Sequence, residues 1–108
     1  MSLNFLGLTA AVTAFLSIWM GHVAVRKIEF LSPTIWLPTL IFLALGLTAE
    51  TCSLTMTNRP LSTILGIFGI TLLWDALEIT RQQNRVRKGH APANPRNPRH
   101  GEMMKDEG

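Results

Sequence analysis

The sequence predicts an all-α integral membrane protein with three transmembrane helices and a disordered basic C-terminal arm. Three long runs without an acidic or basic side chain predict these helices, and they cover Ser2–Val25, Phe30–Ala49 and Pro60–Trp74. A helix needs about 20 apolar residues to cross the hydrocarbon layer of a bilayer. The first two runs reach that length, and the third reaches it with the turn that follows Trp74.

Length and charge narrow the class of protein further. A chain of 108 residues is one domain at most, and three spans leave no length for a soluble catalytic domain. The net charge is +3, and seven of the ten Lys and Arg residues follow Trp74. Because this basic segment directly follows a span, we expect it to contact anionic lipid headgroups of the bilayer, and we expect no nucleic-acid partner.

The first span is predicted over residues 3–25 and ends before Arg26 and Lys27. The N-terminal residues lack the basic region of a signal peptide and offer no convincing cleavage site, so we expect this segment to be retained as a helix. The single cysteine, Cys52, excludes an internal disulfide and any metal site built from several cysteines.

The second span is predicted over residues 32–50 and the third over residues 61–80, with a turn between them. Pro38 is expected to kink the second span by freeing a backbone carbonyl one turn earlier. The third span must include Asp75 and Glu78 to reach its length, so both carboxylates are expected at the membrane interface.

The chain changes character after the third span. We predict a three-helix transmembrane domain over residues 1–88 and a cytoplasmic tail over residues 89–108. Pro92, Pro95 and Pro98 recur at every third residue, which predicts an extended, polyproline-like arm. The mixed-charge residues from Met103 to Gly108 are expected to be disordered.

The distribution of positive charge predicts the orientation. Lys and Arg are retained on the cytoplasmic side of membranes. With three spans, the loop after the first span and the tail share one side, while the other side holds only Arg59. This places the N-terminus outside and the tail in the cytoplasm. The residues predicted at this membrane interface are Trp19, Trp36 and Trp74, as an aromatic belt, with Arg26, Lys27, Arg81, Arg85, Arg87 and Lys88.

Small residues recur at helical spacing and predict where helices pack. In lipid, small side chains allow the close backbone approach that stabilises helix bundles. The candidate packing residues are Gly7, Ala10 and Ala14 in the first span and Ser62, Gly66 and Gly69 in the third. Two interpretations stay open, because these faces can pack within the chain or against a second copy or another membrane subunit.

Several polar residues are candidates for a functional role. His22 near the end of the first span has the chemistry to ligate a haem or pigment or to carry protons, but an interfacial histidine hydrogen-bonded to a loop is the preferred interpretation. Asp75, Glu78, Gln82 and Arg85 fall on one helical face, interpreted as the solvated emergence of the last helix, with an ion path as the alternative. Glu29 and Glu50 carry the same ambiguity.

Enzyme signatures are not found in the sequence. It contains no phosphate loop, metal-spaced histidine pair, nucleophile elbow or CxxC motif. We therefore predict no catalytic residues, no metal site and no cofactor, and an enzyme acting on lipids is the least favoured class.

The chain also resembles a known family. The carrying residues include Gly21-His22, then Trp74-x-x-x-Glu78-x-x-x-Gln82-x-x-Arg85-Val86-x-Lys88-Gly89, and finally Pro92-x-Asn94-Pro95. Over about residues 4–96 they resemble a family of short bacterial membrane proteins described only as a domain of unknown function. The family usually has an aromatic pair where this chain has His90 and Ala91. The resemblance implies a protein of the bacterial cytoplasmic membrane and implies no activity.

Two functions of different classes follow from these observations. The leading hypothesis is a non-enzymatic accessory or scaffold subunit that packs against itself or a larger membrane complex. The alternative is a small oligomeric transporter or channel that uses interfacial Glu50, Asp75, Glu78 and His22.

Overall fold

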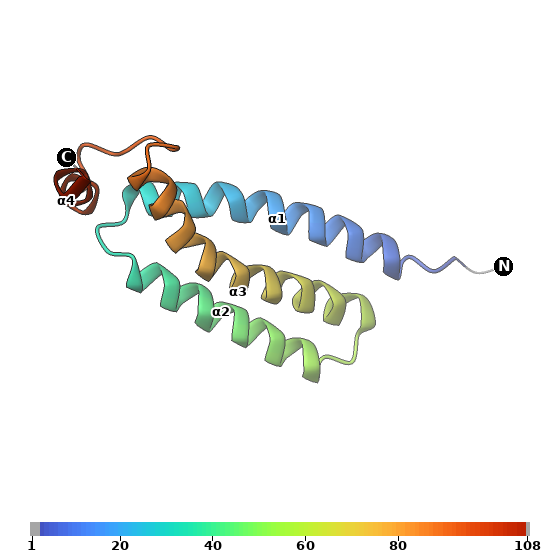
Figure 1. The fold of residues 1–108 in the computed structure, drawn as a ribbon. Coiled ribbons are helices and arrows are strands. Elements are labelled where there is room, and N and C mark those ends of the chain that lie inside the picture. Colours follow the sequence, from blue (N-terminus) through green and yellow to red (C-terminus); the bar gives the residue numbers. More distant parts are fainter. Residues whose placement is uncertain (1–2, 108) are drawn as a thin grey trace.

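The computed structural model describes residues 3–107 and is built from helices (Figure 1). In chain order these are α1 (Leu6–Leu31), α2 (Trp36–Thr55), α3 (Arg59–Arg87) and α4 (Pro98–Glu107). No residue among those described belongs to a strand. The predicted all-α class is confirmed.

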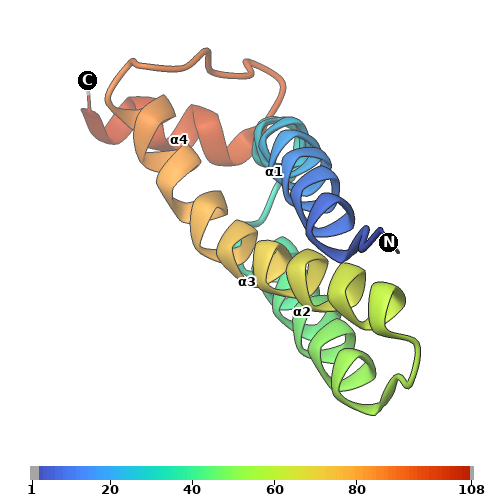
Figure 2. The same cartoon turned by 90° about the vertical axis from the view of Figure 1, so that its right-hand side faces the viewer.

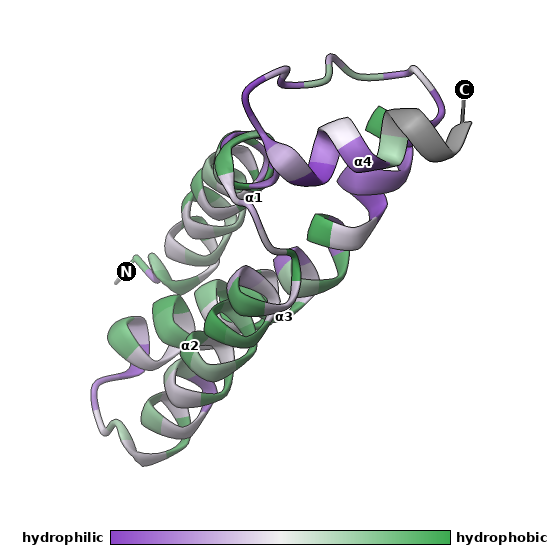
Figure 3. Ribbon diagram, turned by 90° about the vertical axis from the view of Figure 1, so that its left-hand side faces the viewer, coloured by the Kyte–Doolittle hydropathy of each residue, from purple (hydrophilic) through white to green (hydrophobic). Residues whose placement is uncertain are grey.

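The first three helices are long and apolar enough to span a membrane. They contain 26, 20 and 29 residues, which correspond to about 39, 30 and 44 Å of helix at about 1.5 Å per residue. The hydrocarbon layer is about 30 Å thick. Figure 3 shows that hydrophobic residues dominate these helices and that hydrophilic residues gather at α4 and the adjoining end of α3. The prediction of three spans is confirmed on length and composition.

The three long helices pack in a row with α3 in the middle (Figures 1 and 2). α1 contacts one side of α3 and α2 contacts the other. A small core where the three helices meet consists of Val25, Phe42, Leu72, Ala76 and Ile79. Most other large apolar side chains point outward and are exposed, which suits helices surrounded by lipid.

The bounds of α2 change the role of Pro38. The sequence predicts a span from residue 32, which would place Pro38 inside the helix as a kink. The helix begins instead at Trp36, so Pro38 lies in its first turn, where a missing N–H breaks no helical hydrogen bond. The expected kink is therefore not required.

Polar contacts fix the hairpin of α2 and α3 at its turn. Asn58 caps α3 by accepting a hydrogen bond from the backbone N–H of Leu61 at 3.0 Å. Ser53 and Ser62 each donate their hydroxyl to the backbone carbonyl of the other, both at 2.7 Å. This reciprocal pair ties the two helices together at the end of the bundle where α2 finishes.

α3 continues beyond the predicted residue 80 as far as Arg87. It ends in a Schellman motif, in which the N–H of His90 donates to the carbonyl of Arg85 and the N–H of Gly89 to that of Val86. Gly89 has a φ of 82°, a left-handed conformation that glycine adopts without strain. We call the end of the bundle at which α1 and α3 finish the basic end.

The tail differs from the extended, disordered arm predicted by its sequence. Residues 98–107 form α4, which lies across the basic end (Figure 2). We call residues 94–100 the C-terminal clasp, because their side chains hold the end of α1. The prediction of an extended arm was wrong over residues 98–107, which form a helix that begins at Pro98. Side chains of residues 94–100 also form hydrogen bonds with the end of α1. Residue 108 lies outside the described residues.

Candidate functional site

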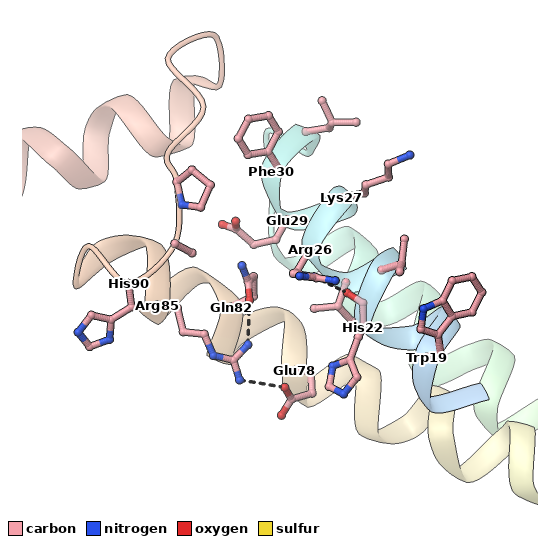
Figure 4. A pocket seen from close by; sticks show the side chains of 15 residues that line it. Trp19, His22, Arg26, Lys27, Glu29, Phe30, Glu78, Gln82, Arg85 and His90 are labelled. Carbon is pink, nitrogen blue, oxygen red and sulfur yellow. Dashed lines mark hydrogen bonds and ion pairs between the residues drawn. The ribbon is translucent and has the colours of Figure 1, made fainter. Parts of the chain in front are cut away.

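A cleft between α1 and α3 opens at the basic end (Figure 4). The cleft has two parts, and the larger one has a volume of about 1110 Å³. α1 supplies one wall and α3 the other, while the loop at residues 90–92 supplies a third side. The polar residues that line it are His22, Arg26, Lys27, Glu29, Glu78, Gln82, Arg85 and His90. The cleft therefore gathers most of the candidate polar residues in one place.

A polar stripe on α3 is buried beside this cleft. Asp75, Glu78 and Gln82 are each only 6% exposed. Glu78 forms ion pairs with Arg81 and Arg85, each with an N–O distance of 3.3 Å, and Arg85 also donates to Oε1 of Gln82 at 2.8 Å. The sequence places these residues on one face, but the interpretation of a solvated face was wrong for its first three members, because packing buries them.

Gly21 lets α1 approach this stripe closely. A Cβ at Gly21 would lie 2.7 Å from Oδ2 of Asp75, so a larger residue would push the two helices apart. His22 is the next residue and is exposed at the cleft. A smaller part of the cleft, of about 370 Å³, lies here and shares His22, Val25 and Glu78 with the larger part. The two parts therefore adjoin one another.

Glu50 lies apart from the other candidate polar residues. It belongs to the contact between α2 and α3, where a Cβ at Gly69 would come within 2.5 Å of its Oε1. This oxygen is buried and has no hydrogen-bond partner in the described part of the chain. The structure thus brings His22, Asp75 and Glu78 to the cleft and leaves Glu50 outside it.

Glu29 is the centre of a second polar cluster. It is 1% exposed, and its Oε2 accepts from Nη1 of Arg99 at 2.7 Å and bonds Nε2 of His100 at 2.8 Å. The backbone N–H of Asn94 donates to Nδ1 of His100 at 2.8 Å, so Nε2 carries the ring hydrogen and donates to Glu29. Arg99 also donates to Oε1 of Gln83 at 2.6 Å, which links the clasp to α3.

The clasp also satisfies backbone carbonyls at the end of α1. Asn97 donates its side-chain amide to the carbonyls of Phe30 and Ser32, at 3.0 and 2.9 Å. Asn94 donates to the same carbonyl of Phe30 at 2.9 Å. The last carbonyls of a helix have no partner within the helix. Here side chains more than 60 positions further along the chain supply the missing donors.

The sequence interpretation missed the clasp residues, although one local signal was present. Asn97 caps α4 by accepting from the N–H of Arg99 at 3.0 Å, and Pro98 begins the helix. Asn followed by Pro is a favoured helix start. The contacts of Asn94 and His100 with the end of α1 depend on tertiary folding and leave no comparable signal in the neighbouring residues.

The candidate packing residues of α3 are used within the chain. A Cβ at Gly66 would lie 3.2 Å from Oγ of Ser53, and one at Gly69 would lie 3.1 Å from Cβ of Ala49. Ser62 forms the reciprocal hydroxyl contact with α2. This face of α3 therefore packs against α2, which is one of the two interpretations left open by the sequence.

The candidate packing residues of α1 have a different environment. Ala10 and Ala14 are half-buried, and a Cβ at Gly7 would meet nothing within 4 Å. The buried residues of α1 begin only at Ser17 and continue at every fourth residue to Glu29. The half of α1 near the N-terminus, residues 6–16, thus has no buried residue.

The predicted interface residues are on the surface, as their role requires. Trp19, Trp36 and Trp74 are 59%, 61% and 52% exposed. Arg81 stacks over the ring of Trp74, with its guanidinium carbon 5.0 Å from the ring centroid. The remaining members of the set are also exposed, namely Arg26, Lys27, Arg85, Arg87 and Lys88. Their depth in a bilayer stays a prediction.

The described side chains contain no cluster suited to a metal ion, which would need three or more His, Cys, Asp or Glu residues close together. The cleft instead combines exposed indoles, guanidinium groups and buried carboxylates. Such a lining offers charged groups and hydrogen-bond donors to a polar ligand.

Comparison with known proteins identifies a family and no individual relative. No curated protein and no solved structure matches the chain. One family model, described as "Domain of unknown function (DUF4491)", matches residues 4–97. The match covers all three long helices and the first part of the clasp, which confirms the resemblance seen in the sequence. The chain belongs to this family of unknown function.

Proposed function

We propose that the protein is a non-enzymatic accessory or scaffold subunit that assembles in the membrane with a second copy of itself. The observation that carries this proposal is the open surface around Gly7 on α1. Of the five glycines in α1, α2 and α3, it is the only one at which an added Cβ would meet nothing within 4 Å.

The other four glycines indicate how this chain uses small residues. Built Cβ atoms would lie 2.7 Å from α3 at Gly21, 2.7 Å from α3 at Gly46, and 3.2 and 2.5 Å from α2 at Gly66 and Gly69. Each therefore lies where two helices approach closely. By analogy, Gly7 lies on a face of α1 suited to close packing of a helix, and that helix comes from another chain.

A second copy is the partner that fits best. Lipid chains leave little hydrophobic drive between helices, so association depends on packing, which small residues favour. Gly7 lies in the half of α1 where Ala10 and Ala14 are only half-buried. Two identical faces of this kind can meet about a two-fold axis, which is the commonest symmetry of homo-oligomers.

We also propose the bacterial cytoplasmic membrane as the location, with the N-terminus outside and the tail in the cytoplasm. Support comes from the basic residues of the cleft and clasp, which share one end of the bundle, and from the rule that such residues stay in the cytoplasm. The transporter alternative has less support, because Glu50 does not share the cleft of His22, Asp75 and Glu78.

The test measures assembly of the full-length chain in lipid nanodiscs or mild detergent. Gly7→Leu places a large side chain in open space, so it should leave the fold of the single chain intact. We expect the fraction of cross-linked or native-mass dimer to fall at least tenfold. Ala44→Leu is the matched control, because it makes a similar enlargement on an exposed face of α2 and should leave the dimer unchanged.

Two results would contradict the proposal. One is a wild-type chain that stays monomeric at every protein-to-lipid ratio. The other is a dimer that persists in Gly7→Leu, which would exclude this face of α1 as the contact.

A further inference from the structure

The cleft between α1 and α3 has both a polar and an apolar part. Near the basic end, Arg26, Lys27 and Arg85 line its larger part. Towards the middle of the bundle, Ile18, Ile70 and Trp74 line its smaller part. Three residues line both parts, so the two parts adjoin, with the charged groups at one end and the apolar side chains at the other.

The charges around the polar part favour an anionic head. Glu78 is paired with Arg81 and Arg85, and Glu29 is paired with Arg99, so these carboxylates are neutralised by guanidinium groups of the chain itself. Within the described residues, Arg26 and Lys27 form no ion pair with a carboxylate. The lining contains three carboxylates (Glu29, Asp75 and Glu78) and three basic side chains (Arg26, Lys27 and Arg85), and Arg81 and Arg99 add two positive charges from outside the lining.

The cleft also has room for a sizeable ligand and the surroundings expected of a lipid site. Sites for ligands of drug size occupy about 300–1000 Å³, and the two parts of this cleft measure about 1110 and 370 Å³. Trp19 and Trp74 line the cleft and are more than half exposed, which suits the boundary between headgroups and acyl chains.

We infer that this cleft binds an anionic phospholipid. Its phosphate is held by Arg26 and Lys27 of α1 and by Arg85 of α3, and an acyl chain follows Ile18 and Ile70 into the bilayer. Guanidinium groups bind phosphate through paired hydrogen bonds, which gives the headgroup a fixed position. The loop at residues 90–92 lines a third side of the cleft at the basic end.

The test counts bound lipid on the purified full-length chain by native mass spectrometry. Phosphatidylglycerol is titrated against phosphatidylcholine with the same acyl chains, and we expect preferential retention of phosphatidylglycerol. The double variant Arg26→Gln/Lys27→Gln should lower this retention at least tenfold, since it removes two charge-assisted hydrogen bonds to the phosphate, which residues outside the cleft do not form. Ala91→Trp, which narrows the cleft without changing charge, should lower it as well.

A control variant separates the cleft from general surface charge. Lys88→Gln/Arg96→Gln removes the same charge from exposed positions at the same end and outside the cleft, so its retention should stay within twofold of wild type. An equal loss in this control would overturn the site, because attraction would then be non-specific. Competition by inorganic phosphate at a concentration similar to that of the lipid would also overturn it, by identifying a free anion as the ligand.

Discussion

Replacing Glu29 with Gln should release the C-terminal clasp without unfolding the three long helices. Glu29 accepts two short hydrogen bonds, at 2.7 Å from Arg99 and 2.8 Å from His100, in a position only 1% exposed. Hydrogen bonds to a charged group contribute about 1.5–3 kcal/mol and neutral ones about 0.5–1.5 kcal/mol. Replacing two charged hydrogen bonds by two neutral ones therefore costs about 2–3 kcal/mol. This corresponds to about 30- to 150-fold in the equilibrium between the docked and the released clasp.

Hydrogen exchange of the full-length protein measures this equilibrium directly. The backbone N–H groups of Asn94, Arg99 and Gly101 are hydrogen-bonded only while the clasp keeps its folded form. Their exchange should therefore accelerate by the same factor in Glu29→Gln, while amides in the middle of α3 stay protected. Glu102→Gln is the matched control, since this carboxylate is exposed. Unchanged exchange at residues 94–101 in Glu29→Gln would refute the role given to the buried carboxylate.

Two further predictions test the hairpin and the orientation. Gly69→Ala should lower the midpoint of thermal unfolding in detergent, because its Cβ would lie within 2.5 Å of a carboxylate oxygen and 3.1 Å of a methyl group of α2, and overpacking costs about 1–3 kcal/mol. Gly7→Ala, in open space, should cause no loss, and equal effects at both positions would contradict the packing argument. Cys52 is exposed near the end of the bundle opposite the basic end, so it should react with a membrane-impermeant maleimide added outside intact cells. Reaction only after lysis would reverse the proposed orientation.

The three long apolar helices were predictable because their signal is local. A helix that must cross lipid keeps charged residues out of about 20 positions, and that pattern is visible without any knowledge of contacts. The ends were less predictable. α3 continues past residue 80 to Arg87 because its polar residues are compatible with a helix. A Schellman motif at Gly89 then ends it. α2 begins at Trp36 and not at residue 32, and the sequence did not distinguish the two starts because Pro33 and Pro38 are both compatible with the first turn of a helix.

The candidate site could be predicted only in part, because only some of its features leave a local signal in the sequence. The spacing of Asp75, Glu78 and Gln82 places them on one face, but spacing does not reveal that the surrounding fold buries this face. The clasp depends on contacts such as Asn97 with Phe30, which join residues that are 67 positions apart. A contact at that separation is created by folding, and a single sequence records only its local part, the helix cap at Asn97.

The polar contacts explain how a row of apolar helices keeps a defined geometry. Apolar side chains distinguish little between a neighbouring helix and a lipid chain, so hydrogen bonds and close packing must select the correct neighbours. The pair of Ser53 and Ser62 makes this selection for α2 and α3. For α1 and α3 it is made at the basic end, where Arg99 contacts both Glu29 and Gln83. α1 is thus held to α3 at one end only. The cleft lies beside that end, whereas the half of α1 around Gly7, which has no buried residue, is the face that we propose for a second copy.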